Sequence, residues 1–346
     1  MRASLVFAAL ASAASLLSAA PASAAPPAPV QNVHVTSTAD RDGEVIATIS
    51  WTPPADADGA RACAQQGVQP ATDPTACDVY FDADTANTTL DLVGGKTYTF
   101  SVFAYAGAGT AREFSAPATT RPWHGSKVRL KLCDFPTYGV PCRIDAVLTD
   151  TRLDSRLQGA RVELWRGVPE LNPDWRLFDA DRTDGDGDAH VRVTPRDEHY
   201  FQWRFQGVEG VLASTSANAK VTPRIRVTAH LTHSNASPGE RVKIYGIVRP
   251  KLDALRIDLI EYQTTPCRSW QFTGQRVTAK RQRLPNGNTT FGYVMTISRS
   301  TLGTYRFEVA TGSHRGFTYG MSDRVTLTIG SGGRGSSRSA PGVPAC

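Results

Sequence analysis

The sequence lacks the short motifs by which common hydrolases are recognised. Neither Gly-x-Ser-x-Gly nor His-Glu-x-x-His occurs, so neither the nucleophile turn of an α/β-hydrolase nor the zinc-binding helix of a metalloprotease is encoded. His230 and His233 have no Cys or carboxylate at metal-ligand spacing, and we interpret them as surface histidines. The sequence therefore predicts no catalytic residue, no metal site and no cofactor.

Long apolar runs are also scarce. The main one covers residues 5–17 and is followed by the small residues Ala22-Ser23-Ala24. This order is typical of a secretory signal peptide over residues 1–24, and the run is too short and too rich in Ala for a spanning helix. The mature chain is expected to begin at Ala25 and to be secreted, either released or held at the cell wall without a covalent link.

Cysteine is sparse, with six residues in the chain. Export permits disulfides, and six cysteines allow fifteen complete pairings. Nearness in the sequence favours Cys63 with Cys77 and Cys133 with Cys142. Cys267 and Cys346 remain. They either pair with each other, or Cys346, at the end of a flexible tail, joins two chains in a dimer.

What the chain has in quantity is alternation. Tyr98, Phe100, Val102 and Ala104 alternate with Thr and Ser, which predicts a strand with one buried face. A similar aromatic strand recurs late in each of the two regions that follow. Gly and Pro number 29 and 22 and are scattered through the 346 residues, as expected for many short strands and turns. These features predict an all-β protein of three tandem β-sandwich domains.

The first predicted domain, residues 28–122, contains four features of note: Pro29-x-x-x-Val33-x-Val35, Trp51-x-Pro53, Leu92 six positions before Tyr98, and Ser115-Ala-Pro117. In these features it resembles a fibronectin type III module. The family pattern has a short loop and a third strand where this chain has a long, Asp- and Ala-rich stretch over residues 55–77. Cys63 and Cys77 are predicted to form a disulfide within that stretch. The stretch is either a binding loop or an excursion of the chain that the disulfide stabilises.

The next two predicted domains, residues 124–222 and 223–330, resemble each other. With their short alternating strands and turns such as Pro238-Gly239 and Asn286-Gly287, they also resemble bacterial immunoglobulin-like domains. Residues 331–346 form a Gly- and Ser-rich flexible tail. In the second domain, Phe201, Trp203 and Phe205 are predicted to point inward. The matched segments are 143–147 with 243–247, 161–166 with 256–261, Trp175 with Trp270, 200–205 with 305–309, and Ser216 with Ser322.

Five carboxylates crowd one turn of the second domain, at positions 179, 181, 184, 186 and 188. A calcium loop that starts at Asp184 would need Gly at the place of Ala189 and Glu at the place of Pro195. The segment is therefore predicted to be a solvated hairpin tip.

Four of the six Trp bear on the alternative of sugar binding, because exposed aromatic rings can stack on sugars. Trp51 and Trp203 lie on faces that are expected to be buried. Trp175 and Trp270 recur at a matched position, which predicts a shared role in packing the core.

Charge is distributed unevenly along the chain. Residues 26–122 carry 5 Lys and Arg against 11 Asp and Glu, whereas residues 224–330 carry 16 against 6. The densest basic run contains Lys280, Arg281 and Arg283. A domain this basic attracts anionic polymers, and these three residues are the predicted contact with a cell-wall polymer or polysaccharide. The alternatives are a charged surface that serves solubility, or a contact with the acidic first domain.

The function expected from the sequence is non-catalytic binding or adhesion at the cell envelope. Nucleic acid is not expected as a partner, because the basic domain lacks the stacked aromatics of a nucleic-acid groove. The resemblance to fibronectin type III modules implies an alternative, an accessory role in extracellular polysaccharide degradation, and leaves open an activity on glycosyl bonds. A second alternative is a structural spacer.

Overall fold

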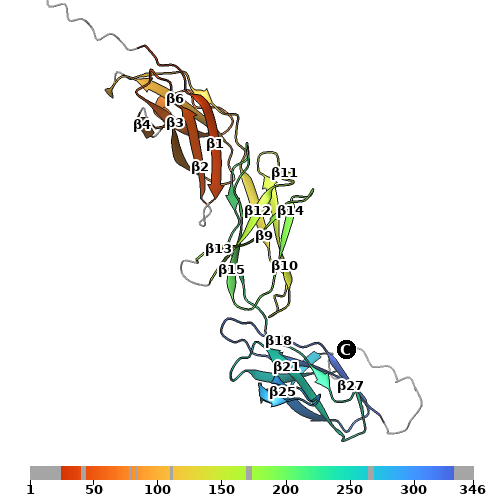
Figure 1. Cartoon of the computed structure of the whole chain (residues 1–346). Helices are drawn as coiled ribbons and strands as arrows, with labels where there is room; N and C mark the ends of the chain where they lie inside the picture. The colour runs from red at the N-terminus through yellow and green to blue at the C-terminus, as the bar shows by residue number, and fades with distance from the viewer. Residues whose placement is uncertain are drawn as a thin grey trace, which may run out of the picture. The chain divides into compact units, whose positions relative to one another are not determined.

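The computed structural model describes residues 25–39, 44–77, 79–82, 85–109, 112–168, 174–263 and 269–330. Over these ranges the protein is all-β, with 27 strands and one short 3-10 helix (Figure 1). No helix in the described ranges is long and apolar enough to cross a membrane. The expected signal peptide, the tail, Cys267 and Cys346 lie outside the described residues.

The strands form six sheets, which we group in chain order as the first (β1–β8), second (β9–β17) and third (β18–β27) sheet pairs. Residue contacts divide the chain into two compact units. Unit 1 consists of the described residues within Met1–Thr36, Ala47–Leu90 and Thr97–Trp123, and unit 2 of those within Ser37–Ile46, Asp91–Lys96 and His124–Cys346.

The first sheet pair consists of a three-stranded sheet, β1-β2-β5, and a five-stranded sheet, β4-β3-β6-β7, in which β8 also pairs with β6. Their bounds are β1 Gln31–Ala39, β2 Val45–Thr52, β3 Gly59–Gln66, β4 Val79–Asp82, β5 Asn87–Leu92, β6 Tyr98–Ala106, β7 Glu113–Phe114 and β8 Ala118–Thr119, with the 3-10 helix η1 at Pro74–Ala76.

The aromatic strand β6 was expected to bury one face and in fact buries both. Eight of its nine residues are buried. Phe103, on the face opposite Phe100, packs with Ala71, Cys63 and Cys77 in a small second cluster. The one-face prediction is wrong because a polar alternation identifies a strand but not what a distant segment of the chain lays over its outer face.

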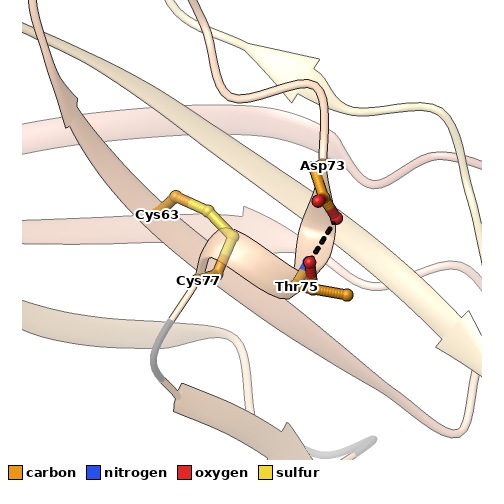
Figure 2. The surroundings of a disulfide bond; sticks show 4 residues. All are labelled: Cys63, Asp73, Thr75 and Cys77. Atoms are coloured by element: carbon orange, nitrogen blue, oxygen red, sulfur yellow. Dashed lines mark hydrogen bonds between the residues drawn. A yellow bond between two sulfur atoms is a disulfide. The ribbon is translucent and has the colours of Figure 1, made fainter.

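The covering segment is held by the predicted Cys63–Cys77 disulfide, whose Cα atoms are 5.0 Å apart (Figure 2). Asp73 starts η1 by accepting hydrogen bonds from the Thr75 hydroxyl and N–H, at 2.7 and 2.8 Å. These bonds lower the pKa of Asp73. The 55–77 stretch is therefore only partly a loop. Residues 59–66 form β3, which pairs with both β4 and β6, and the excursion is confined to residues 67–77.

The second sheet pair encloses one core between the sheets β11-β10-β14, with β9 on β10, and β13-β12-β15-β16, with β17 on β15. Phe201, Trp203 and Phe205 point into this core, as predicted. The Cys133–Cys142 disulfide is also present. The bounds are β9 Ser126–Lys131, β10 Cys142–Asp150, β11 Ser155–Arg156, β12 Arg161–Gly167, β13 Arg176–Arg182, β14 Asp188–Val193, β15 His199–Phe205, β16 Ser214–Thr215 and β17 Ala219–Val221.

The third sheet pair encloses its own core between β18-β21-β25-β24, with β19 on β21, and β20-β27-β26-β22-β23. The bounds are β18 Arg226–Val227, β19 His230–Leu231, β20 Asn235–Ala236, β21 Arg241–Arg249, β22 Arg256–Gln263, β23 Ser269–Thr278, β24 Lys280–Arg283, β25 Thr289–Ser298, β26 Gly303–Thr311 and β27 Val325–Ile329.

One serine has the same role in all three sheet pairs. Its hydroxyl accepts a hydrogen bond from a backbone N–H of a central strand, at 2.9–3.0 Å, and donates to the carbonyl of the next residue. Its own N–H donates back to the same central residue. The serines are Ser115, Ser216 and Ser322, and their partners are Ala104, Trp203 and Val309. This shared device supports the predicted alignment of the repeats.

The four tryptophans with a predicted role divide into two groups. Trp51 and Trp203 are buried, as predicted. Trp175 and Trp270 are half-buried and belong to neither core, so their prediction as core residues is wrong. Each instead lies beneath an arginine: the Arg204 guanidinium is 5.9 Å from the Trp175 ring centroid, and that of Arg324 is 4.9 Å from Trp270. One face of each ring is thus in contact with an arginine cation and not with core side chains.

Candidate anion-binding site

The third sheet pair contains a hairpin that the second lacks. The N–H of Thr183 donates to Ala160, and that of Ala279 donates to Leu255, so these two donors are equivalent and 96 positions apart. A few residues later, Val147 pairs with Asp188 and Ile247 with Gly292. Asp188 and Gly292 are therefore equivalent and 104 positions apart. The third pair has eight additional residues between these points, and they lengthen the connection into a hairpin.

This hairpin consists of β24 and the start of β25, joined by the turn 284–288. The Leu284 N–H donates to the Asn288 carbonyl at 2.8 Å, and the Gly287 N–H donates to the Leu284 carbonyl at 2.9 Å. Gly287 has a φ of 87°, which glycine adopts without strain. Arg281 pairs with Phe291 and Arg283 with Thr289. The turn chemistry therefore fixes which basic side chains stand beside which hydroxyls.

Glycine also allows the hairpin to join the sheet. A Cβ on Gly292 would lie 2.1 Å from the carbonyl oxygen of Gly246 on β21, which is far closer than any side chain tolerates. Because Gly292 has no side chain, β25 can leave the hairpin and pair closely with β21. The hairpin residues therefore lie next to the end of β21.

A pocket of about 290 Å³ lies where the hairpin meets the end of β21. Three of its lining side chains are cationic and two are hydroxyls. Arg249 is half-buried, and its guanidinium donates to the Thr290 hydroxyl at 3.2 Å and to the Val248 carbonyl at 3.1 Å. The Arg249 cation is thus held in place before any ligand arrives. The lining residues are Arg249, Lys251, Arg281, Thr289, Thr290 and Phe291.

Most carboxylates of the third sheet pair are engaged by other cations. Four of the six acidic residues in 224–330 form ion pairs with Arg276, Arg299, Arg324 or His233. Among the described residues, no carboxylate lies within ion-pair distance of the pocket cations. An uncompensated cluster of this kind produces a positive potential that attracts anions.

The structure brings together only part of the predicted basic run. Arg281 lines the pocket, whereas Lys280 and Arg283 are exposed on the same strand outside the lining. Sequence reasoning missed Arg249, the last residue of β21, and Lys251, which follows that strand. Both come some thirty residues earlier in the chain and reach Arg281 through the β21–β25 register. The available signal was the longer spacing between matched segments around the Asn286-Gly287 turn.

The aspartate-rich segment of the second sheet pair is a turn of another kind than predicted. It joins β13 to β14, and these strands belong to different sheets, so it is a connection between sheets and not a hairpin tip. Asp184 accepts hydrogen bonds from the N–H groups of Asp186 and Asp188 at 2.9 and 3.0 Å. Within the described ranges, no group of three or more His, Cys, Asp or Glu side chains could hold a metal ion.

The two histidines also differ from their interpretation in one respect. His233 does have a carboxylate neighbour, since its Nε2 lies 3.0 Å from an oxygen of Glu240. The ring of His230 lies 5.7 Å from that of Tyr245. Seven positions separate His233 from Glu240, and the turn after β20 brings them together.

No family model matches the chain, and no curated protein matches it.

Proposed function

We propose that this protein is a secreted, non-catalytic binding protein that attaches to an anionic polymer of the cell envelope. The observation that carries the proposal is the pocket in which Arg249, Lys251 and Arg281 meet, with no carboxylate of the described residues paired to them. We further propose that the three sheet pairs are a fibronectin type III-like domain and two immunoglobulin-like domains, over 28–122, 124–222 and 223–330. The separate cores of the second and third pairs support this division.

The arrangement of cations favours a polymer over a single anion. Arg283 is exposed on β24 two residues beyond the pocket residue Arg281, so both project from the same face of the strand, whereas Lys280 projects from the other face. At about 3.3 Å per residue, Arg281 and Arg283 lie about 7 Å apart along the strand. A polymer with a charged group on successive units places one group in the pocket and the next at Arg283. The hydroxyls of Thr289 and Thr290 add hydrogen-bond partners for phosphate or carboxylate oxygens.

The proposal is tested by sedimentation of the mature protein with purified cell wall and with insoluble acidic polysaccharide. Binding is expected in 0.1 M salt and is expected to fall steeply at 1 M, where the screening length drops from about 10 Å to about 3 Å. Using both polymers distinguishes a phosphate-bearing ligand from a carboxylate-bearing one.

Charge-matched variants separate the pocket from net charge. The pocket variant is Arg249→Gln/Lys251→Gln/Arg281→Gln. The control is Arg241→Gln/Lys243→Gln/Arg256→Gln, which removes the same charge from exposed positions of the third sheet pair. The pocket variant should lose most of the binding, and the control should keep most of it. Equal losses would contradict a site and leave only general attraction, and no binding by the parent protein would leave a spacer.

A further inference from the structure

A second pocket, of about 330 Å³, lies at one end of the second sheet pair, where several strands begin or end. Val193 ends β14, Val221 ends β17, and His199 starts β15. Its lining includes Arg166, Phe178, Val193, Arg196, Phe201 and Val221. This pocket is separate from the basic site of the third sheet pair.

The floor of this pocket is apolar. Phe201, Val193 and Val221 are at most 5% exposed and belong to the core. The ring of Phe178 is 37% exposed and meets Phe201 edge-on, with 6.1 Å between the ring centroids. The pocket thus reaches down to the edge of the core at this end of the sheets, and Phe178 presents the exposed aromatic surface in it. Such an apolar floor offers no hydrogen bonds to a fully hydrated ion.

The wall of the pocket carries two guanidinium groups. Arg166 pairs with Phe201 across β12 and β15, and its guanidinium lies 5.2 Å from the Phe178 ring centroid. Stacking on the ring holds this cation in place while leaving its N–H edges open. Arg196 lies in the loop between β14 and β15.

The remaining charged or titratable groups at the pocket are Asp197 and His199. The Nδ1 atom of His199 lies 3.1 Å from the backbone carbonyl of Asp197. Among the described residues, no carboxylate forms an ion pair with Arg166 or Arg196. The pocket therefore keeps an excess of positive charge over an apolar floor.

We propose that this pocket binds a small carboxylate with a flat apolar body, such as an aromatic carboxylic acid. The ring would lie against Phe178 and Phe201, and the carboxylate would accept hydrogen bonds from Arg166 and Arg196, a geometry that guanidinium groups favour. The volume falls in the range of small-ligand pockets. This inference does not depend on the polymer-binding proposal, because the two sites share no residue.

The test is titration of the mature protein, followed by calorimetry, with 3-phenylpropanoate as the probe. Two matched compounds dissect the recognition: 3-phenylpropanamide keeps the ring without the charge, and acetate keeps the charge without the ring. The carboxylate should bind about ten-fold or more tightly than the amide, as expected for charge-assisted hydrogen bonds, and acetate should not saturate. Equal binding of acid and amide, or no binding of the acid at 10 mM, would overturn the proposal.

Variants locate the binding. Arg166→Gln/Arg196→Gln should weaken 3-phenylpropanoate by about ten-fold or more, and Phe178→Leu should weaken it while preserving apolar bulk. The control is Arg192→Gln, an exposed arginine next to Val193 that lies outside the lining. Unchanged melting temperatures would show that the variants fold. If all four proteins bind the probe equally, the pocket is not its site.

Discussion

The second and third sheet pairs have matched segments on both sides of one connection, the connection that follows their matched tryptophans. The connection itself differs in length. In the second pair, the chain leaves Thr183 directly into a turn built on Asp184. In the third pair, eight additional residues form a hairpin that carries Lys280, Arg281 and Arg283. The hairpin forms its own ladder and turn hydrogen bonds, and it also contributes Phe291 to the core of the third pair. A charged surface can thus be added at a single turn of one of two similar sheet pairs when one of the added residues joins the core.

The largest effect is expected when the hairpin of the third pair is replaced by the shorter turn of the second pair. Residues 280–291 would be replaced by the four-residue turn of the second pair, residues 184–187. The chimera removes Arg281, Thr289, Thr290 and Phe291 from the pocket, and we expect about 100-fold weaker sedimentation with the anionic polymer, equivalent to about 2.7 kcal/mol. A cooperative melt would show that the scaffold survives, and polymer binding by a folded chimera would place the site elsewhere.

The ends of β10 and β21 offer a second contrast, in pH dependence. Asp150 ends β10 and is buried, whereas the equivalent position after β21 is Pro250. Burial opposes ionisation of Asp150, but hydrogen bonds from the Leu153 N–H, His124 and the Arg152 N–H outweigh it and lower the pKa. Asp150 therefore contributes stability above its unfolded pKa near 4, and that contribution is lost as the pH falls through the lowered folded value.

Hydrogen exchange can measure this contrast. Asp150→Asn should destabilise the second sheet pair by roughly 1–3 kcal/mol at pH 7 and leave the protection of β21 and β25 unchanged. The variant should also lose less protection than the parent between pH 7 and pH 3. If parent and variant lose the same protection between pH 7 and pH 3, then Asp150 does not cause the acid sensitivity of the second sheet pair.

The shared serines predict an equal loss of stability in the second and third sheet pairs when either is replaced. Ser216→Ala and Ser322→Ala each leave a buried backbone N–H, that of Trp203 or Val309, without its acceptor. Each should cost roughly 1–2 kcal/mol, as measured by denaturant unfolding. A cost at one position and none at the other would show that the two devices are not equivalent.

The smallest expected effect concerns the stacked tryptophans. Trp175→Leu and Trp270→Leu keep apolar bulk but remove the ring on which Arg204 and Arg324 lie. Each should destabilise by about 0.5–1 kcal/mol. A loss of several kcal/mol from either would instead indicate a core position, as the sequence had suggested.

Sequence reasoning succeeded where neighbouring residues decide the outcome. Alternation identified the strands, the inward face of Phe201, Trp203 and Phe205 followed from their bulk, and nearness paired Cys63 with Cys77. These are local properties, and a linear pattern contains them.

It failed where a distant segment decides. The outer face of β6 is covered by residues 67–77. Trp175 and Trp270 belong to neither core, although their recurrence at a matched position suggested a core role. Arg249 and Lys251 join Arg281 only because β21 and β25 pair in one register. A period of two reports that two faces exist, but burial of each face depends on partners that the pattern does not name.

The position of β24 has a further consequence. It is the outermost strand of its sheet, and such strands offer unpaired backbone groups to any neighbour that approaches. When two copies of this protein meet edge to edge, Lys280, Arg281 and Arg283 of one face the same cations of the other. Strand pairing between copies is then opposed by like charge. The basic run on β24 thus protects this sheet edge from pairing with another copy of the chain.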